Sequence, residues 1–288
     1  MILPPEARGM RLDQAVRQRL IASGRQVSVR EVRLALKRGT IVINGRIAPP
    51  GRRAAGDEQI DIARFVARAE SILIPCADPR VTVIADTEDV LVLDKPSGMA
   101  TLPLRIDETG TLLHAAAALR PEIATAGPPL EGGAVHRLDT GTSGVVLFAK
   151  SKASRHRLRR AFRYRAVRKT YWALTVAPPW TSRTIAAHLA GTGPKMRVVD
   201  EGLEAQTDAF VMARDQESAW IKADTHYGRR HQVRVHLSHA GAPLFGDALY
   251  GGPPAQRLGL HASEVRLPDG RLFAAPLPPD LTALLEAP

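Results

Sequence analysis

A turn-forming segment, His136-Arg137-Leu138-Asp139-Thr140-Gly141-Thr142-Ser143-Gly144, leads directly into the apolar run Val145-Val146-Leu147-Phe148-Ala149. The apolar run predicts a buried strand. The two glycines give the preceding backbone conformations that other residues avoid, and the hydroxyl side chains can hydrogen-bond the turn from within. We therefore expect Asp139 to be held on a fixed turn, either as a structural cap of that turn or as a reactive group mounted on buried sheet.

The pattern around this segment predicts an α+β domain. Helical patterns cover 111–119 and 151–165, and the second carries a dense run of arginines on its exposed face. Strand patterns cover 81–85, 90–93, 144–149, 169–176, 205–212 and 219–225. Because strands and helices do not alternate regularly, we expect a mixed, mainly antiparallel sheet and not a doubly wound one.

The first sixty or so residues predict a separate, small α/β module. A helical pattern runs from Leu12 to Leu20, and a second helix is expected between a Ser28 cap and Gly39. Strands are expected at 41–43 and 59–62, with Asn44-Gly45 as a tight turn. The predicted division is a module at 1–62, a linker at 63–80 and the larger domain at 81–288.

Composition favours a polyanionic partner. The 288 residues carry a formal charge of +11, and such a field attracts nucleic acid or an anionic membrane surface. No apolar run approaches the ~20 residues of a membrane span, and the N-terminus lacks the pattern of a secretory signal. We therefore expect a cytoplasmic protein. Cys76 is the only cysteine, which excludes an intrachain disulfide and a cysteine-based zinc site.

A histidine-rich segment near residue 230 could suggest a metal site. Its histidines follow no defined zinc-binding spacing, and the arginines interleaved with them would repel a cation. We therefore predict no metal and interpret this segment as basic recognition surface. Periodicity does not decide whether 228–237 is a strand or a helix. The residues concerned are His226, Arg229, Arg230, His231, Arg234, His236 and His239.

The N-terminal module resembles the small RNA-binding module, often called the alpha-L motif, of a primary-binding protein of the small ribosomal subunit. The resemblance rests on Arg11-Leu12-Asp13, on Ser28-Val29-Arg30 and on 39–45. The many cations of this module, with few acidic partners, favour binding to phosphates. Its expected RNA-binding residues are Arg11, Arg30, Lys37 and Arg38.

Seven blocks of the larger domain carry a recognisable pattern: Asp94–Gly98, His136–Gly144, Arg168–Ala173, Gly228–Leu237, Gly246–Gly252, Leu260–Ala262 and Ala275–Pro278. In these blocks, and in their order, the domain resembles the RluA-type pseudouridine synthases. Two short departures, the absence of a histidine before Pro103 and the Pro268-Asp269-Gly270 turn, bear on substrate choice more than on activity.

The resemblance implies isomerisation of uridine to pseudouridine in RNA without a cofactor or metal. Asp139 matches the essential aspartate that attacks the target nucleotide, and Tyr171 matches the active-site tyrosine that lies against the base. Arg234 matches the basic residue that pairs with the aspartate, and a neighbouring cation favours an ionised carboxylate. Arg137 matches the arginine that takes the place of the flipped base, whose extrusion costs a few kcal/mol.

The expected partner is therefore RNA, ribosomal RNA first and transfer RNA second, bound by a monomer. Further RNA contacts in the larger domain are expected from His136, Arg229 and Arg230. One alternative is a catalytically inactive RNA-binding or ribosome-assembly protein that retains the fold. Another is a nucleoside hydrolase that uses Asp139, although the chain lacks the aspartate cluster with which such enzymes hold calcium.

Overall fold

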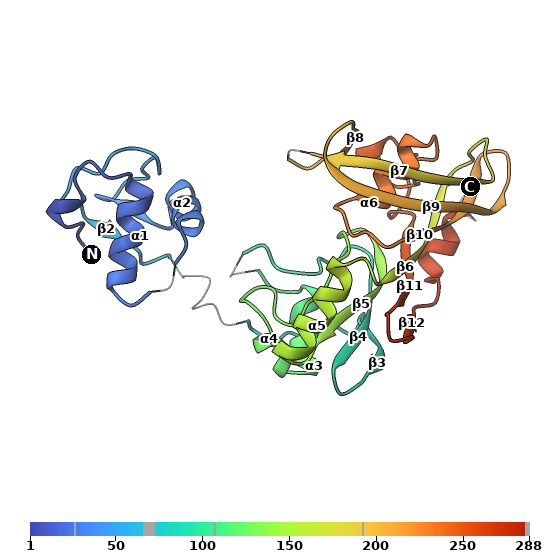
Figure 1. The fold of residues 1–288 in the computed structure, drawn as a ribbon, viewed down its shortest axis with the longest axis horizontal. Helices are drawn as coiled ribbons and strands as arrows, with labels where there is room; N and C mark the ends of the chain where they lie inside the picture. The colour runs from blue at the N-terminus through green and yellow to red at the C-terminus, as the bar shows by residue number, and fades with distance from the viewer. Residues whose placement is uncertain (26, 66–72, 106–107, 192, 286–288) are drawn as a thin grey trace. The chain divides into compact units, whose positions relative to one another are not determined.

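The computed structural model of the chain describes residues 1–25, 27–65, 73–105, 108–191 and 193–285. The chain forms two compact units (Figure 1). One comprises Met1–Leu73, Leu104–Asp107 and Pro128–Leu130, and the other comprises Ile74–Pro103, Glu108–Gly127 and Glu131–Pro288. Part of the expected linker, residues 66–72, lies outside the described residues. No helix in the described ranges is long and apolar enough to cross a membrane.

The first unit packs two helices and a two-stranded sheet around one apolar core that includes Leu12, Val32 and Ile60. As predicted, Ser28 caps the second helix: its Oγ accepts the amide hydrogen of Glu31 at 3.2 Å. The elements are η1 (Pro5–Ala7), α1 (Leu12–Ala22), α2 (Val29–Arg38), β1 (Val42–Ile43) and β2 (Ile60–Asp61).

A tight turn follows β1, but it does not lead to the strand that pairs with β1. Asn44 and Gly45 have positive φ angles of 49° and 72°, and Ile43 forms a bridge with Arg46 across them. The antiparallel partner of β1 is β2, with Ile43 opposite Ile60. The turn therefore redirects the chain, and the loop after it returns the chain to β1.

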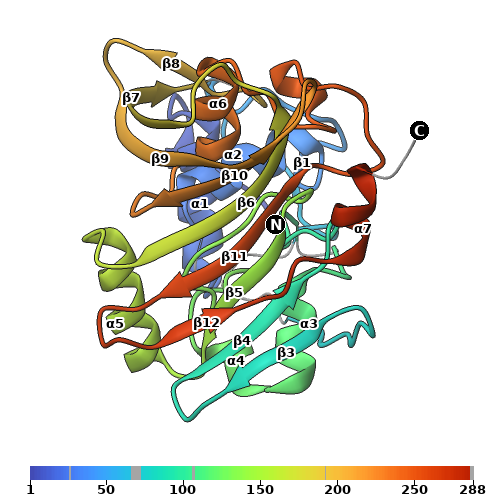
Figure 2. The ribbon, with the colours of Figure 1, turned by 90° about the vertical axis from the view of Figure 1, so that its right-hand side faces the viewer.

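The second unit is organised by one 10-stranded sheet. Its order is β3-β4-β5-β11-β6-β10-β9-β7-β8, and β12 pairs with β11. Figure 2 shows the strands side by side, with β5, β11 and β6 near the middle. The strands are β3 (Thr82–Asp86), β4 (Val90–Lys95), β5 (Ser143–Ala149), β6 (Arg168–Val176), β7 (Ser182–Ala190), β8 (Arg197–Val199), β9 (Leu203–Arg214), β10 (Ser218–Thr225), β11 (Leu260–Arg266) and β12 (Leu272–Ala274).

The sheet is mixed and mainly antiparallel, so the predicted α+β class is confirmed. β5 and β11 run parallel, with Ser143 opposite His261, and the other strand pairs in the described ranges are antiparallel. The parallel pair joins segments more than a hundred residues apart, because parallel neighbours need a long crossover. This pairing brings the start of β5, directly after Asp139, into the centre of the sheet.

Short helices pack against this sheet. α5 contacts β5 and α6 contacts β9. Leu158 of α5 shares an apolar cluster with Val145 and Leu147 of β5 and Val265 of β11. The second unit contains α3 (Leu112–Leu119), α4 (Glu122–Thr125), α5 (Lys152–Arg163), α6 (Gln232–His239), η3 (Ala248–Tyr250), α7 (Pro279–Thr282) and η4 (Ala283–Leu285).

The structure adds four strands that the sequence pattern did not predict: β7, β8, β11 and β12. β11 contains His261, Ser263 and Glu264, and polar residues in a short segment hide the strand pattern. The ambiguous segment 228–237 becomes helical from Gln232 onward. Its N-cap residue, His231, has a φ of 53°, a left-handed conformation that non-glycine residues adopt infrequently.

Candidate active site

Asp139 lies in the loop before β5, and its neighbours anchor that loop on both sides. Leu138 is 5% exposed. Its carbonyl accepts the hydroxyl hydrogen of Thr101 at 2.9 Å, and its amide donates to the same hydroxyl at 3.2 Å. The amide of Thr142 donates to the Asp139 carbonyl at 3.0 Å. The carboxylate therefore projects from a turn whose backbone is fixed at three points.

The segment after β4 clamps the same turn. Lys95 is fully buried, and its ammonium donates to the carbonyls of Pro96, Met99 and Thr140 at 2.9, 2.7 and 3.1 Å. The Ser97 hydroxyl adds a bond to the carbonyl of Gly141 at 2.8 Å. Burial lowers the pKa of Lys95 to about 7, and Arg257 lowers it further while Asp139 opposes the shift. Lys95 thus links the segment after β4 to the loop that carries Asp139.

Arg234 of α6 connects Asp139 to a second, buried carboxylate. One Nη of Arg234 donates to Asp139 Oδ2 at 3.1 Å. Its Nε and its other Nη donate to Asp247 at 2.8 Å each. Burial acts to lower the pKa of Arg234, but the bonds to Asp247 and Asp139 outweigh burial and raise it. The guanidinium is therefore permanently charged and fixed in orientation.

A chain of hydrogen bonds from Met196 and Tyr250 holds His231 beside the same carboxylate. The Met196 amide donates to the Tyr250 hydroxyl at 2.9 Å, and that hydroxyl is 2.9 Å from His231 Nδ1. The tautomer of the imidazole decides which of these two groups donates, and the other ring nitrogen is Nε2. That nitrogen is 3.9 Å from Asp139 Oδ2. Burial lowers the pKa of His231; the charge of Asp139 opposes this shift, and the charges of Arg234 and Arg230 add to it.

Tyr171 enters the site from β6. Its side chain is 8% exposed. Burial raises the pKa of its phenol, and the charge of Asp139 raises it further. The structure therefore brings Asp139, Tyr171 and Arg234 into one electrostatic neighbourhood, with Tyr171 as a neutral phenol.

The other basic residues expected to contact RNA in this unit differ in their surroundings. Arg137 is exposed, and the described part of the chain gives it no ionic partner. His136 stacks on Phe162 at 4.7 Å, and its Nε2 accepts the amide hydrogen of Leu147 at 3.1 Å. Arg229 donates to the Glu204 carbonyl at 3.0 Å and Arg230 contacts the Met196 sulfur at 3.2 Å.

Four basic residues expected to contact RNA lie in the first unit. Arg30, Lys37 and Arg38 are exposed on α2. Arg11 is bound to Asp13, which is 0% exposed, with the closer bond at 3.0 Å. This hydrogen bond lowers the pKa of Asp13, against the effect of burial. Asp13 also accepts from Arg33 of α2, so Arg11 contributes to the junction between α1 and α2 as well as to the charged surface.

The sequence analysis assigned no role to Asp247, Tyr250 or Lys95, although each lies in a block that it quoted. The sequence motifs that contain these three residues were recognised. Their contacts with Arg234, His231 and the Asp139 loop, however, join segments that lie far apart in the sequence. The described residues contain no group of three histidine, cysteine or acidic side chains that could hold a metal ion.

Comparisons with known proteins identify one family. Residues 89–239 match the family model described as RNA pseudouridylate synthase. The chain is 32% identical over 256 residues to the ribosomal large subunit pseudouridine synthase D of Pseudomonas aeruginosa, covering 87% of this chain and 76% of that protein. It is 29% identical to the protein of the same name from Haemophilus ducreyi, covering 97% and 91%. The solved structure of human RNA pseudouridylate synthase domain containing 1 aligns with a TM-score of 0.60 at 25% identity, covering 73% and 89%.

Proposed function

This chain belongs to the RNA pseudouridylate synthase family, and we propose that it converts specific uridines of large-subunit ribosomal RNA to pseudouridine, with Asp139 as the nucleophile. The contact between Arg234 and Asp139 Oδ2 at 3.1 Å carries the assignment of the nucleophile. The names of its relatives from Pseudomonas aeruginosa and Haemophilus ducreyi support the choice of RNA. Transfer RNA is the second candidate, and the enzyme acts as a monomer.

The geometry of Asp139 suits attack on a sugar carbon. Arg234 engages Oδ2, and in the described part of the chain Oδ1 has no donor. The carboxylate is 23% exposed on its side chain, so Oδ1 can reach a nucleotide that enters the site. A carboxylate stabilises or captures the cationic sugar as the bond from C1′ to N1 of the base breaks. The base then turns and bonds to C1′ through C5, and the proton on C5 moves to N1.

Tyr171 suits the role of a flat support for the turning base. Its raised pKa keeps it a neutral phenol, so the ring can stack on uracil without placing a second negative charge beside Asp139. The hydroxyl can also accept or pass on a proton late in the reaction.

Arg137 suits the role of a wedge in the RNA duplex. It is exposed two residues before Asp139, close enough to enter the space from which the target nucleotide has turned out. Extruding a nucleotide costs a few kcal/mol, and a planar guanidinium that stacks in the gap offsets part of this cost.

The first unit suits a second contact with RNA. Arg30, Lys37 and Arg38 are exposed on α2. We assign this unit to sequence-independent binding of phosphates through these residues and Arg11, in keeping with its resemblance to the alpha-L motif.

Pseudouridine mapping in large-subunit ribosomal RNA tests the proposal. RNA from cells lacking the gene is labelled with carbodiimide and read by primer extension after complementation. Wild type and the matched exposed-residue control, Asp200→Ala, are expected to restore the mark. Asp139→Ala is expected to leave it absent, because removal of a nucleophile lowers kcat by about 10³ or more.

Each other outcome has a distinct meaning. Restoration by Asp139→Ala would remove that residue from the role of nucleophile. Loss of a site in transfer RNA, with large-subunit RNA unchanged, would leave the enzyme assignment in place and correct the RNA class. Loss of no site in any RNA would favour the inactive RNA-binding alternative.

A further inference from the structure

α5 carries more positive charge than its ion pairs neutralise. The helix contains no acidic residue. Arg155 and Arg159 both donate to Glu131, at 2.7 and 3.0 Å, and Arg157 donates to Asp89 at 2.5 Å. These three arginines therefore have partners on other segments and flank the outer side of the helix.

The remaining basic residues form a stripe that we call the basic crest: Lys152, His156, Arg160 and Arg163. Their spacing of four, four and three residues places them on one side of a helix. All four are exposed, whereas Leu158 on the opposite side is buried. In the described ranges none of the four has an ion-pair partner.

Helix stability explains only part of the basic crest, because the helix dipole favours Arg160 and Arg163 in the last turn. Arg160 and Arg163, three residues apart, repel one another at a cost of a few tenths of a kcal/mol. Lys152 is the first residue of the helix, where the helix dipole disfavours positive charge. A bound polyanion would offset both the repulsion within the basic crest and the unfavourable position of Lys152, because it attracts these positive charges.

The C-terminal end of α5, where Arg160 and Arg163 lie, contacts the loop that carries Asp139 through Phe162. Phe162 of α5 stacks on His136 at 4.7 Å with the rings 18° apart, and Arg137 is the next residue of that loop. Tyr164, at the C-cap of α5, is 69% exposed, and the Arg160 guanidinium lies 5.8 Å from its ring centre. This contact lies on the exposed surface at the end of α5.

We propose that the basic crest binds the phosphate backbone of the RNA stem that holds the target uridine, with Arg137 facing the base pair to be opened. The inference rests on the proposed function and adds a docking surface to it. From Lys152 to Arg163 the helix rises about 16 Å, enough to follow several phosphates of one strand. Arginine forks suit such phosphate contacts.

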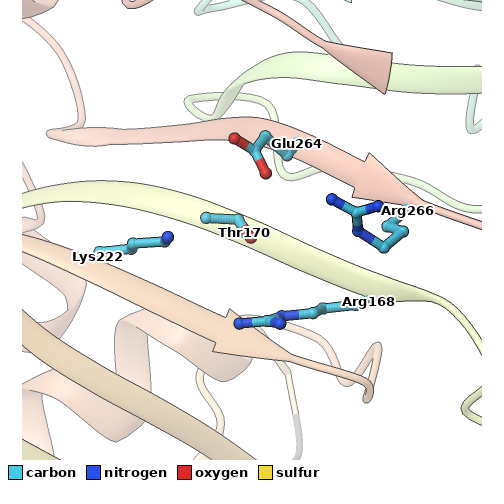
Figure 3. Close-up of a pocket in the computed structure, with 5 residues that line it drawn as sticks. All are labelled: Arg168, Thr170, Lys222, Glu264 and Arg266. Carbon is cyan, nitrogen blue, oxygen red and sulfur yellow. The ribbon is translucent and has the colours of Figure 1, made fainter. Parts of the chain in front are cut away.

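A charge-matched pair of variants tests the proposal in the full-length protein. The crest variant is Arg160→Gln with Arg163→Gln. The control is Lys222→Gln with Arg266→Gln, which removes the same charge from the sheet face opposite Tyr171. These two residues line a hollow of about 130 Å³ together with Arg168, Thr170 and Glu264 (Figure 3).

Binding is measured by fluorescence anisotropy with a labelled RNA stem-loop over a range of salt concentrations, after circular dichroism shows that both variants fold. We expect the crest variant to bind about tenfold more weakly and its salt slope to fall by about 2, one unit for each lost phosphate contact. The control is expected to keep the wild-type affinity and slope.

Equal weakening of the two variants would show that only net charge matters and would overturn the proposal, as would unchanged binding of the crest variant. Weakened binding to single-stranded RNA alone would also contradict the assignment to a stem. The proposed function fails separately, if wild type forms no pseudouridine in cells, because the binding comparison does not depend on turnover.

Discussion

At the scale of single residues, the site depends on a guanidinium shared between two carboxylates. Asp247 takes two bonds from Arg234 at 2.8 Å each, and its side chain is 1% exposed. Removing one partner of a buried ion pair leaves the other charge uncompensated and free to reorient. Asp247 is therefore a positioning residue for Arg234, and through Arg234 for Asp139.

Asp247→Ala is expected to lower the rate of pseudouridine formation about 100-fold, because a displacement of about 1 Å at a reacting group has an effect of this size. RNA affinity should remain near that of wild type. The measurement is single-turnover kinetics with saturating RNA, and Asp200→Ala is the control. A wild-type rate in Asp247→Ala would show that Arg234 is held without it.

At the scale of elements, the position of β5 depends on a close approach to β11. Gly144 has a φ of 115°, and a Cβ built there would lie 2.2 Å from the Ala262 carbonyl oxygen. The neighbouring Ser143 hydroxyl lies 2.9 Å from His261 Nδ1 and accepts from Arg257 at 2.6 Å. Gly144, which follows the loop that carries Asp139, must therefore lack a side chain because β11, a strand more than a hundred residues away, passes so close to it.

Gly144→Ala is expected to lower the free energy of unfolding by about 3 kcal/mol, since both its φ and the space around it exclude a side chain. Gly270→Ala is the matched control: its φ is 91°, but nothing lies within 4 Å of the added carbon. It should cost only about 1 kcal/mol. Urea denaturation followed by circular dichroism measures both, and equal costs would rule out the close approach as the cause.

At the scale of the whole molecule, buried histidines link folding to pH. Burial lowers the pKa of His136 to about 3 and that of His236 and of His261 to about 4, from an ordinary value of 6.5. The folded protein therefore keeps these imidazoles neutral at pH values where the unfolded chain protonates them. Between pH 6.5 and about 4 the unfolded chain binds more protons, so stability falls as pH falls.

The free energy of unfolding is expected to decrease from neutral pH to about pH 5, by up to ~1.4 kcal/mol per pH unit for each buried histidine. Urea titrations at several pH values measure this slope. His226→Gln, a change at an exposed histidine, should leave it unchanged. A flat profile over this range would mean that the three imidazoles titrate in the folded state as they do in the unfolded chain.

The sequence by itself determined the local elements and the family. Ser28 and Gly39 bounded α2, the apolar run 145–149 predicted β5, and the quoted blocks led to the family that the comparisons confirm. These signals are local, because capping, periodicity and motif spacing depend on neighbours in the chain.

Only the tertiary structure decided which residues meet. Strand β11 carries polar residues whose partners, such as Ser143 for His261, come from elsewhere in the chain, so its pattern did not indicate a buried strand. Arg234 likewise bonds to both Asp139 and Asp247, and Lys95 bonds to the loop that carries Asp139. These bonds join segments that sequence spacing cannot place together. Pairing of distant strands sets these distances, since long-range contacts leave no periodic trace in the sequence.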